Sequence, residues 1–89
     1  MRFSWDPSKD RLNQRDHETA FQEATTVFGD PLAVTVSDPD HSIGEERFVT
    51  IGQSTSGQLL VVCHIEQGDT IRIISARRAT AYERKDHET

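Results

Sequence analysis

Two adjacent arginines, Arg77 and Arg78, stand where a predicted strand changes into a predicted helix. The strand is indicated by three isoleucines within residues 71–74, which suit a pleated, half-buried surface. The helix is indicated by Thr80 and Glu83, which have the spacing of a capping box. An arginine side chain is always charged, and its planar fork of donors matches the oxygen atoms of a phosphate. The junction is therefore predicted to bind a phosphodiester.

Charge is distributed unevenly along the 89 residues. The net charge of −5 argues against a general nucleic-acid coat protein, because such proteins are usually basic. Residues 71–85 nevertheless carry five cations and one anion, while acidic residues gather within 16–23 and 38–46. This distribution could focus a phosphate in a cleft. An unevenly charged solvated surface explains it equally well.

A line of polar side chains accompanies the first predicted helix, Pro7–Asp16. Lys9, Asn13 and His17 are spaced four residues apart, so all three project along one helix face. Such a line could contribute to a polar site. A plain solvated face is the simpler interpretation, because Leu12 is the only large apolar residue of this helix.

A hairpin is predicted between the last two strands, Gln58–Glu66 and Thr70–Arg77. With three loop residues, apolar side chains pair with one another and His64 faces Arg72 on the more open face of the sheet, which is the register we prefer. With a two-residue turn, His64 would lie opposite Ile73. That register would weaken the case for a site at His64.

The pattern of apolar residues predicts an α+β fold. Met1–Trp5 alternates as a short strand, and two helices follow, the second of which starts at the candidate cap Thr19 and ends at Gly29. A four-stranded antiparallel meander is predicted next, with strands at Leu32–Ser37, Glu45–Ser54, Gln58–Glu66 and Thr70–Arg77. A C-terminal helix completes the chain. We expect the helices to pack on one face of the sheet and to leave the other face for a ligand.

Length, cysteine content and hydropathy limit the class of protein. A chain of this length is expected to form one small domain, 1–89, with a thin core. The single cysteine, Cys63, excludes an internal disulfide and fits a reducing cytoplasm. No apolar run approaches the roughly 18 residues that span a bilayer. The acidic loop Asp38–Gly44 contains His41 but lacks the spacing of a standard metal site, so we expect neither a metal nor another cofactor.

Several segments, spread in order over nearly the whole chain, carry a family resemblance. They are Phe3–Lys9, Asn13, His17, Phe21–Ala24, Val27–Leu32, Gly44–Phe48 and Ile73–Thr80. Together they resemble the BrnT family of bacterial type II toxins. The resemblance implies a RelE-like ribonuclease fold and an endoribonuclease that inhibits translation. It also implies neutralisation by a BrnA-like ribbon-helix-helix antitoxin, with operator DNA contacted only through that antitoxin.

The sequence departs from the family pattern at two places. Glu18 stands where the family usually has a glycine, and this adds an anion near the predicted phosphate site. The family often ends in Glu-Arg-x-x-Tyr, whereas this chain has His87 at the tyrosine position. The second departure removes an aromatic or acidic group unless His87 or Tyr82 replaces it. Both departures bear on activity more than on fold.

RNA cleavage without a metal requires a proton-transfer group and two or more cations at the phosphate. Read with the resemblance, Arg47 and Arg77 are predicted to bind the phosphate. Proton handling or substrate orientation is assigned to Lys9 and His17, and Tyr82 is a candidate acid. His64 is a second candidate for proton transfer or a hydrogen-bonded strand histidine. The residues predicted to bind RNA are His64, Arg72, Arg78 and Arg84.

A function of a different class fits the same residues. The chain could be a catalytically degenerate toxin fold that only binds its antitoxin, an interpretation that the net acidity and Glu18 favour. A DNA-binding regulator that acts alone is disfavoured, because the sequence has no recognisable recognition helix.

Overall fold

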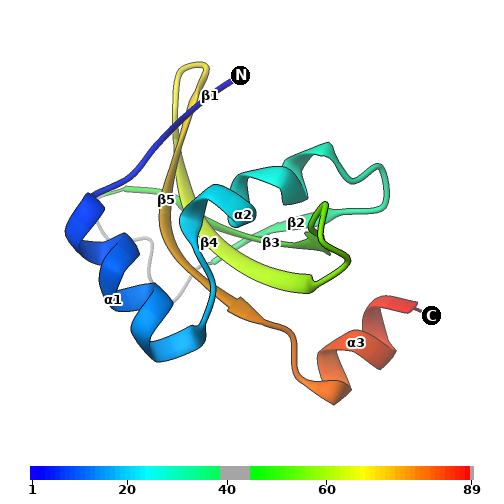
Figure 1. Ribbon diagram of the computed structural model, residues 1–89. Coiled ribbons are helices and arrows are strands. Elements are labelled where there is room, and N and C mark those ends of the chain that lie inside the picture. The colour runs from blue at the N-terminus through cyan, green and yellow to red at the C-terminus, as the bar shows by residue number, and fades with distance from the viewer. Residues whose placement is uncertain (39–44, 89) are drawn as a thin grey trace.

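The structure, a computed structural model, describes residues 1–38 and 45–88 of the chain. Within these residues, five strands form one sheet in the order β1-β5-β4-β3-β2, flanked by three α-helices (Figure 1). The strands are β1 (Arg2–Ser4), β2 (Val34–Ser37), β3 (Arg47–Gln53), β4 (Leu59–Gln67) and β5 (Thr70–Arg78). The helices are α1 (Pro7–His17), α2 (Phe21–Thr25) with the 3₁₀ helix η1 (Thr26–Gly29), and α3 (Ala81–Glu88).

The predicted α+β class and the antiparallel meander are confirmed, since β2, β3, β4 and β5 pair in chain order. The sheet is larger than predicted, because β1 pairs in parallel with β5 and sets Phe3 opposite Ile71. β1 thereby covers part of an edge of β5 that would otherwise expose unpaired backbone groups. The result is a mixed five-stranded sheet in place of a four-stranded antiparallel one.

One face of the sheet carries the core. Phe21 and Ala24 from α2 and Val27 from η1 are fully buried against side chains of β4 and β5. Figure 1 shows α2 crossing this face. Trp5 packs against the core, with its ring 6.4 Å from that of Phe21 in a T-shaped contact. The helix α3 has no buried residue and stands beyond the end of β5 (Figure 1), so much of the opposite face stays open.

The second helix begins differently from the prediction. The spacing predicts Thr19 as its N-cap, and this is wrong: the N-cap is Ala20, which makes no side-chain capping bond. The backbone N–H of Phe21 donates to Oδ1 of Asp10 at 2.9 Å. A carboxylate from α1 therefore caps α2, and local spacing cannot reveal a cap that comes from another element.

The preferred register of the β4–β5 hairpin is also wrong. Gln67 pairs with Thr70, so the turn contains only Gly68 and Asp69. Gly68 has φ of +65°, a backbone conformation that glycine adopts without strain. His64 consequently lies opposite Ile73 rather than Arg72.

A β-bulge in β5 sets which side chains beyond it face the core. His64 pairs with Ile73, whereas the preceding residue Cys63 pairs with Ser75. The residue between them on β5, Ile74, is therefore the extra residue of the bulge. Because side chains alternate along a strand, an extra residue exchanges the faces of all residues beyond it. Ala76 therefore reaches the core and Arg77 lines the open face.

Candidate functional site

A cavity of about 450 Å³ lies on the face of the sheet opposite α2. Arg47 lines it from β3 and Arg77 from β5. These two strands are separated by β4 and are about 10 Å apart. A polyanion that lies in the cavity would be within reach of both guanidinium groups. The apolar part of the lining comes from the same three strands: Val49, Ile51, Val61, Cys63 and Ile74.

Arg77 is held by a carboxylate from the start of α3. Its Nη1 and Nη2 atoms donate to Oε1 and Oε2 of Glu83 at 2.7 and 2.9 Å. This fork raises the pKa of Arg77 and lowers the pKa of Glu83 to about 2, because each charge stabilises the other through the hydrogen bonds. The backbone N–H groups of Thr80 and Glu83 complete the predicted capping box with Oε1 of Glu83 and Oγ1 of Thr80.

Arg47 and Cys63 complete the chemistry of the cavity. Nη2 of Arg47 lies 3.8 Å from Oε1 of Glu45. Burial raises the pKa of the Cys63 thiol, although the Arg47 charge acts in the opposite direction. A thiol that stays protonated is a poor nucleophile. The cavity therefore offers two cations, Arg47 and Arg77, and two carboxylates, Asp38 and Glu83, rather than an activated protein nucleophile.

Arg77 and Arg78 do not converge on one ligand. Arg77 pairs with Val61, which lines the cavity, whereas Arg78 pairs with Leu60, which is fully buried in the core. Successive side chains of a strand point to opposite faces of the sheet. Of the two arginines at the strand–helix junction, only Arg77 lines the cavity.

The polar line on the first helix has a structural residue at its centre. The buried amide of Asn13 donates to the carbonyl oxygens of Thr19 and Ala76 at 2.8 and 2.7 Å, and its oxygen accepts from the N–H of Ala76 at 3.2 Å. It thereby docks α1 on β5. Lys9 and His17 are exposed on α1 and are not among the residues that line the cavity. The cavity that holds Arg47 and Arg77 therefore does not include the lysine and histidine that the sequence predicted to share a pocket with them.

His64 lies in the core and has no exposed surface. Its Nε2 shares a 2.7 Å hydrogen bond with Oγ1 of Thr50, which shares another with Oγ1 of Thr35. Its ring contacts those of Phe28 and Phe48, with centroids at 4.9 and 5.9 Å. Burial lowers the pKa of His64 to about 4. The expectation that His64 lies on the open face is wrong, and a fully buried side chain offers no atom to an RNA in this structure. The alternative of a hydrogen-bonded strand histidine matches these contacts.

The remaining predicted residues are spread over several surfaces. Arg72 is half-buried on β5 and is not among the residues of the cavity. Tyr82 is 79% exposed on the first turn of α3. Arg84 lines a different cavity together with His87 and Glu88 of the same helix. None of these three residues is among those that line the cavity of Arg47 and Arg77, although Tyr82 precedes the lining residue Glu83.

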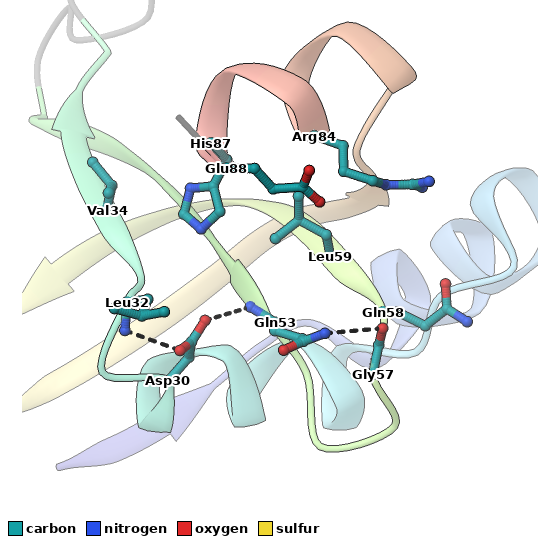
Figure 2. A pocket seen from close by; sticks show the side chains of 10 residues that line it. All are labelled: Asp30, Leu32, Val34, Gln53, Gly57, Gln58, Leu59, Arg84, His87 and Glu88. Atoms are coloured by element: carbon teal, nitrogen blue, oxygen red, sulfur yellow. Dashed lines mark hydrogen bonds between the residues drawn. The ribbon is translucent and has the colours of Figure 1, made fainter.

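That second cavity has a volume of about 820 Å³ and opens between α3, β2 and the β3–β4 turn (Figure 2). The two carboxylate oxygens of Asp30 accept from the backbone N–H groups of Gln53 and Leu32 at 2.8 and 2.9 Å, which lowers the pKa of Asp30. Sequence reasoning missed this cavity because its walls come from separate segments. They include Leu32, Val34, Leu59, Arg84, His87 and Glu88.

Two expectations concern metal ions and membranes. Across residues 1–38 and 45–88, no three His, Cys, Asp or Glu side chains are grouped closely enough to hold a metal ion. The loop that contains His41 lies outside the described residues. In the same part of the chain, no helix combines the length and the apolar character that crossing a membrane requires.

Comparisons with known proteins bear on this geometry. Residues 5–83 match the model of the family described as "Ribonuclease toxin, BrnT, of type II toxin-antitoxin system". The fold is similar to that of the Brucella abortus ribonuclease toxin BrnT, known from a 1.1 Å crystal structure. The TM-score is 0.71 at 20% sequence identity, and the match covers 90% of this chain and 97% of that chain. None of the curated proteins compared with this sequence matches it.

Proposed function

Because this chain belongs to the BrnT family of ribonuclease toxins of type II toxin–antitoxin systems, we propose that it is an endoribonuclease that cuts RNA without a metal ion and so inhibits translation. The observation that carries this proposal is the presence of Arg47 and Arg77 in one open cavity. Such cleavage needs cations at the phosphate, because charge builds up there in the transition state. It needs no nucleophile from the protein, since the attacking group is the 2′-hydroxyl of the RNA.

In the proposed reaction, the 2′-oxygen attacks the adjacent phosphorus and the 5′-oxygen leaves. Arg47 and Arg77 stabilise the charge on the phosphate oxygens. A base removes the proton of the 2′-hydroxyl and an acid protonates the leaving oxygen. We assign the acid role to Tyr82, which precedes the cavity residue Glu83.

The other candidate residues are proposed to hold the RNA outside the cavity. Lys9 and His17 stand on α1, which docks on β5, so RNA that continues across β5 would meet them. This position favours substrate orientation over proton handling. Arg72 and Arg84 are proposed to contact the RNA backbone, and Arg78 to contact either the backbone or the antitoxin.

The partner and setting belong to the same proposal. We infer a BrnA-like ribbon-helix-helix antitoxin that neutralises the toxin, with operator DNA contacted only through it. We take residues 1–89 as a single domain of RelE-like ribonuclease fold, which the sheet with one helix-covered face supports. A cytoplasmic location fits both an RNA substrate and the single thiol of Cys63.

The test is cleavage of RNA by the purified chain in the presence of EDTA. We expect Arg77→Ala and Arg47→Ala each to lower kcat by about 100-fold or more, since each removes a donor at the developing charge. Thermal melts should show that both variants stay folded. Arg15→Ala is the matched control, because this arginine is exposed on α1 and pairs only with Asp16 among the described residues. Full activity of both cavity variants, or activity only with added metal, would contradict the proposal.

A binding module without catalytic activity is the second candidate. It is favoured by the pairing of Arg77 with Glu83 and by the acid beside Arg47, since both cations already have carboxylate neighbours. A chain that binds its antitoxin tightly, yet cuts no RNA under any condition, would support this alternative.

A further inference from the structure

Glu83 lines the same cavity as Arg47 and Arg77, although the proposed chemistry has given it no role. Its carboxylate meets Arg77 end-on, through Nη1 and Nη2. Nη1 also donates to the backbone carbonyl of Arg78 at 3.3 Å. Arginine has five N–H donors, so this arrangement leaves the Nε–H and one Nη2–H without a partner among the described residues. These two donors lie on one edge of the guanidinium and form a second fork that can receive a phosphate bidentately.

The carboxylate is itself fixed in place. The N–H of Thr80 donates to Oε1 of Glu83 at 2.9 Å, and the N–H of Glu83 donates to Oγ1 of Thr80 at 3.1 Å. Glu83 is therefore anchored to the first turn of α3 while its carboxylate holds the side chain of Arg77 from β5. A long, rotamer-rich arginine is thus immobilised before a ligand arrives, and pre-organised donors stabilise developing charge better than mobile ones.

We propose that Glu83 is a positioning residue of the RNA-cleaving site, which holds the guanidinium of Arg77 so that its second fork faces the scissile phosphate. This inference rests on the proposed ribonuclease function. Glu83 acts through Arg77 and does not itself take or give a proton in the reaction. The pairing of Arg77 with Glu83 then prepares the arginine for phosphate rather than blocking it.

Two variants separate this role from helix capping. Glu83→Gln keeps the capping box, because glutamine is accepted at this position, but removes the charge that holds Arg77. Thr80→Ala removes the capping hydroxyl but keeps the backbone N–H of residue 80 that donates to Oε1 of Glu83, so the carboxylate stays beside Arg77. If Glu83 positions Arg77, Glu83→Gln should lower kcat by about 10- to 100-fold with little change in KM, as small misplacements of reacting groups do. Thr80→Ala should keep kcat within about threefold and lower only the melting temperature.

The double variant tests whether Glu83 acts through Arg77. In the Arg77→Ala background, Glu83→Gln should cause no further loss of kcat, because the group that it positions is absent. A further loss of similar size would mean that Glu83 acts on the RNA directly and would overturn the proposal. Equal losses in Glu83→Gln and Thr80→Ala would reduce Glu83 to a helix cap. A gain of activity in Glu83→Gln would make it a blocking group.

Failure of this inference is distinguishable from failure of the proposed function. A wild-type chain that cuts no RNA, or an Arg77→Ala variant with full activity, would overturn the function and this role together. Wild-type cleavage that depends on Arg77 but not on Glu83 would overturn the positioning role alone. NMR of the Arg77 guanidinium should show slow exchange of the Nη–H protons with water in the wild type and in Thr80→Ala. In Glu83→Gln these protons should exchange fast. Unchanged Arg77 signals in Glu83→Gln would contradict the proposed geometry.

Discussion

At the residue scale, burial determines what a histidine can do. His64 is enclosed by two aromatic rings and a threonine hydroxyl, and it has no exposed surface. An imidazole in such surroundings stays neutral because the interior solvates the charged form poorly. His64 therefore contributes to the packing of the sheet rather than to chemistry on its open face.

We predict that His64 makes the fold sensitive to mild acid. Its pKa is about 4 in the folded chain, against an ordinary value of 6.5, so between these values the unfolded chain binds a proton that the folded chain does not. Stability contributed by the neutral form is therefore lost as the pH falls through this window. The free energy of unfolding should drop by about 2 kcal/mol from pH 7 to pH 5 on this account.

Urea titrations at pH 7 and pH 5 measure this effect. His64→Leu should be less stable than the wild type at pH 7 but should lose less on acidification. His17→Ala is the control, because His17 is exposed on α1, and it should keep the acid sensitivity of the wild type. An unchanged pH dependence in His64→Leu would show that another group is responsible.

Glu18 provides a second prediction at the residue scale. It is the C-cap of α1 and has φ of +53°, a left-handed conformation that costs most residues energy but not glycine. Its negative charge also lies at the unfavourable end of the helix dipole. A glycine at this position would adopt the same backbone conformation without strain. Glu18→Gly should raise the free energy of unfolding by about 1 kcal/mol.

Glu18→Ala distinguishes the backbone from the charge. It removes the carboxylate but keeps the strained φ, so in urea melts it should recover only the smaller electrostatic part of the gain. If both variants are equally stabilised, the backbone argument is incorrect. Substantially higher RNA cleavage by both variants would instead mean that the charge of Glu18 repels the substrate.

At the scale of elements, the buried amide of Asn13 joins α1 to the sheet. Asn13 satisfies the N–H and C=O of Ala76 on β5 as well as the carbonyl of Thr19 before α2. It therefore ties three segments together at a place where β1 no longer covers β5. The sequence does not show that this amide is buried, because Asn13 stands among the other polar residues of a mostly polar helix.

Asn13→Ala should be strongly destabilising, because it leaves buried backbone groups of Ala76 and Thr19 without partners. We expect a loss of about 2–4 kcal/mol in the free energy of unfolding. Chemical denaturation measures this loss, and hydrogen exchange at the N–H of Ala76 should become faster. Gln14→Ala is the matched control, since its amide is exposed and bonds only to Asp10 among the described residues. A loss no larger than that of the control would mean that water replaces these bonds freely.

At the scale of the whole molecule, the sheet separates two surfaces. One face is covered by α2 and η1, and the other carries both cavities and is bordered by α3. An arrangement with a rigid covered face and an accessible opposite face suits a protein that must meet both a substrate and an inhibiting partner. The residues that would distinguish a nuclease from a binding module, Arg47, Arg77 and Glu83, line the cavity on the open face.

We predict that the chain expressed without its antitoxin arrests bacterial growth and that Arg77→Ala abolishes the arrest. The reason is that the arrest depends on charge stabilisation at the phosphate, whereas Arg77 is not part of the buried core. Growth curves with matched protein levels provide the measurement. Arg15→Ala should still arrest growth, and growth unaffected by the wild-type chain would favour the binding module.

The sequence by itself determined the features that depend on residues close together in the chain, which are the caps of α1 and α3 and the order of the elements. The start of α1 is one case, where the backbone N–H of Ser8 donates to Oδ1 of Asp6. The Thr80–Glu83 capping box is another. Both caps use side chains within three residues of the groups that they satisfy. The order of the helices and of the antiparallel strands also follows from periodicity, because each element must bury one apolar face.

Only the tertiary structure decided which side chains line the cavity. A bulge at one residue of β5 placed Arg77 in the cavity and Ala76 in the core, and a two-residue turn placed His64 opposite Ile73. The position of α3 brought Glu83 to Arg77. These outcomes depend on a competition between registers that differ by one residue. Packing across the whole sheet selects one of these registers, and a local pattern of residues does not show that packing.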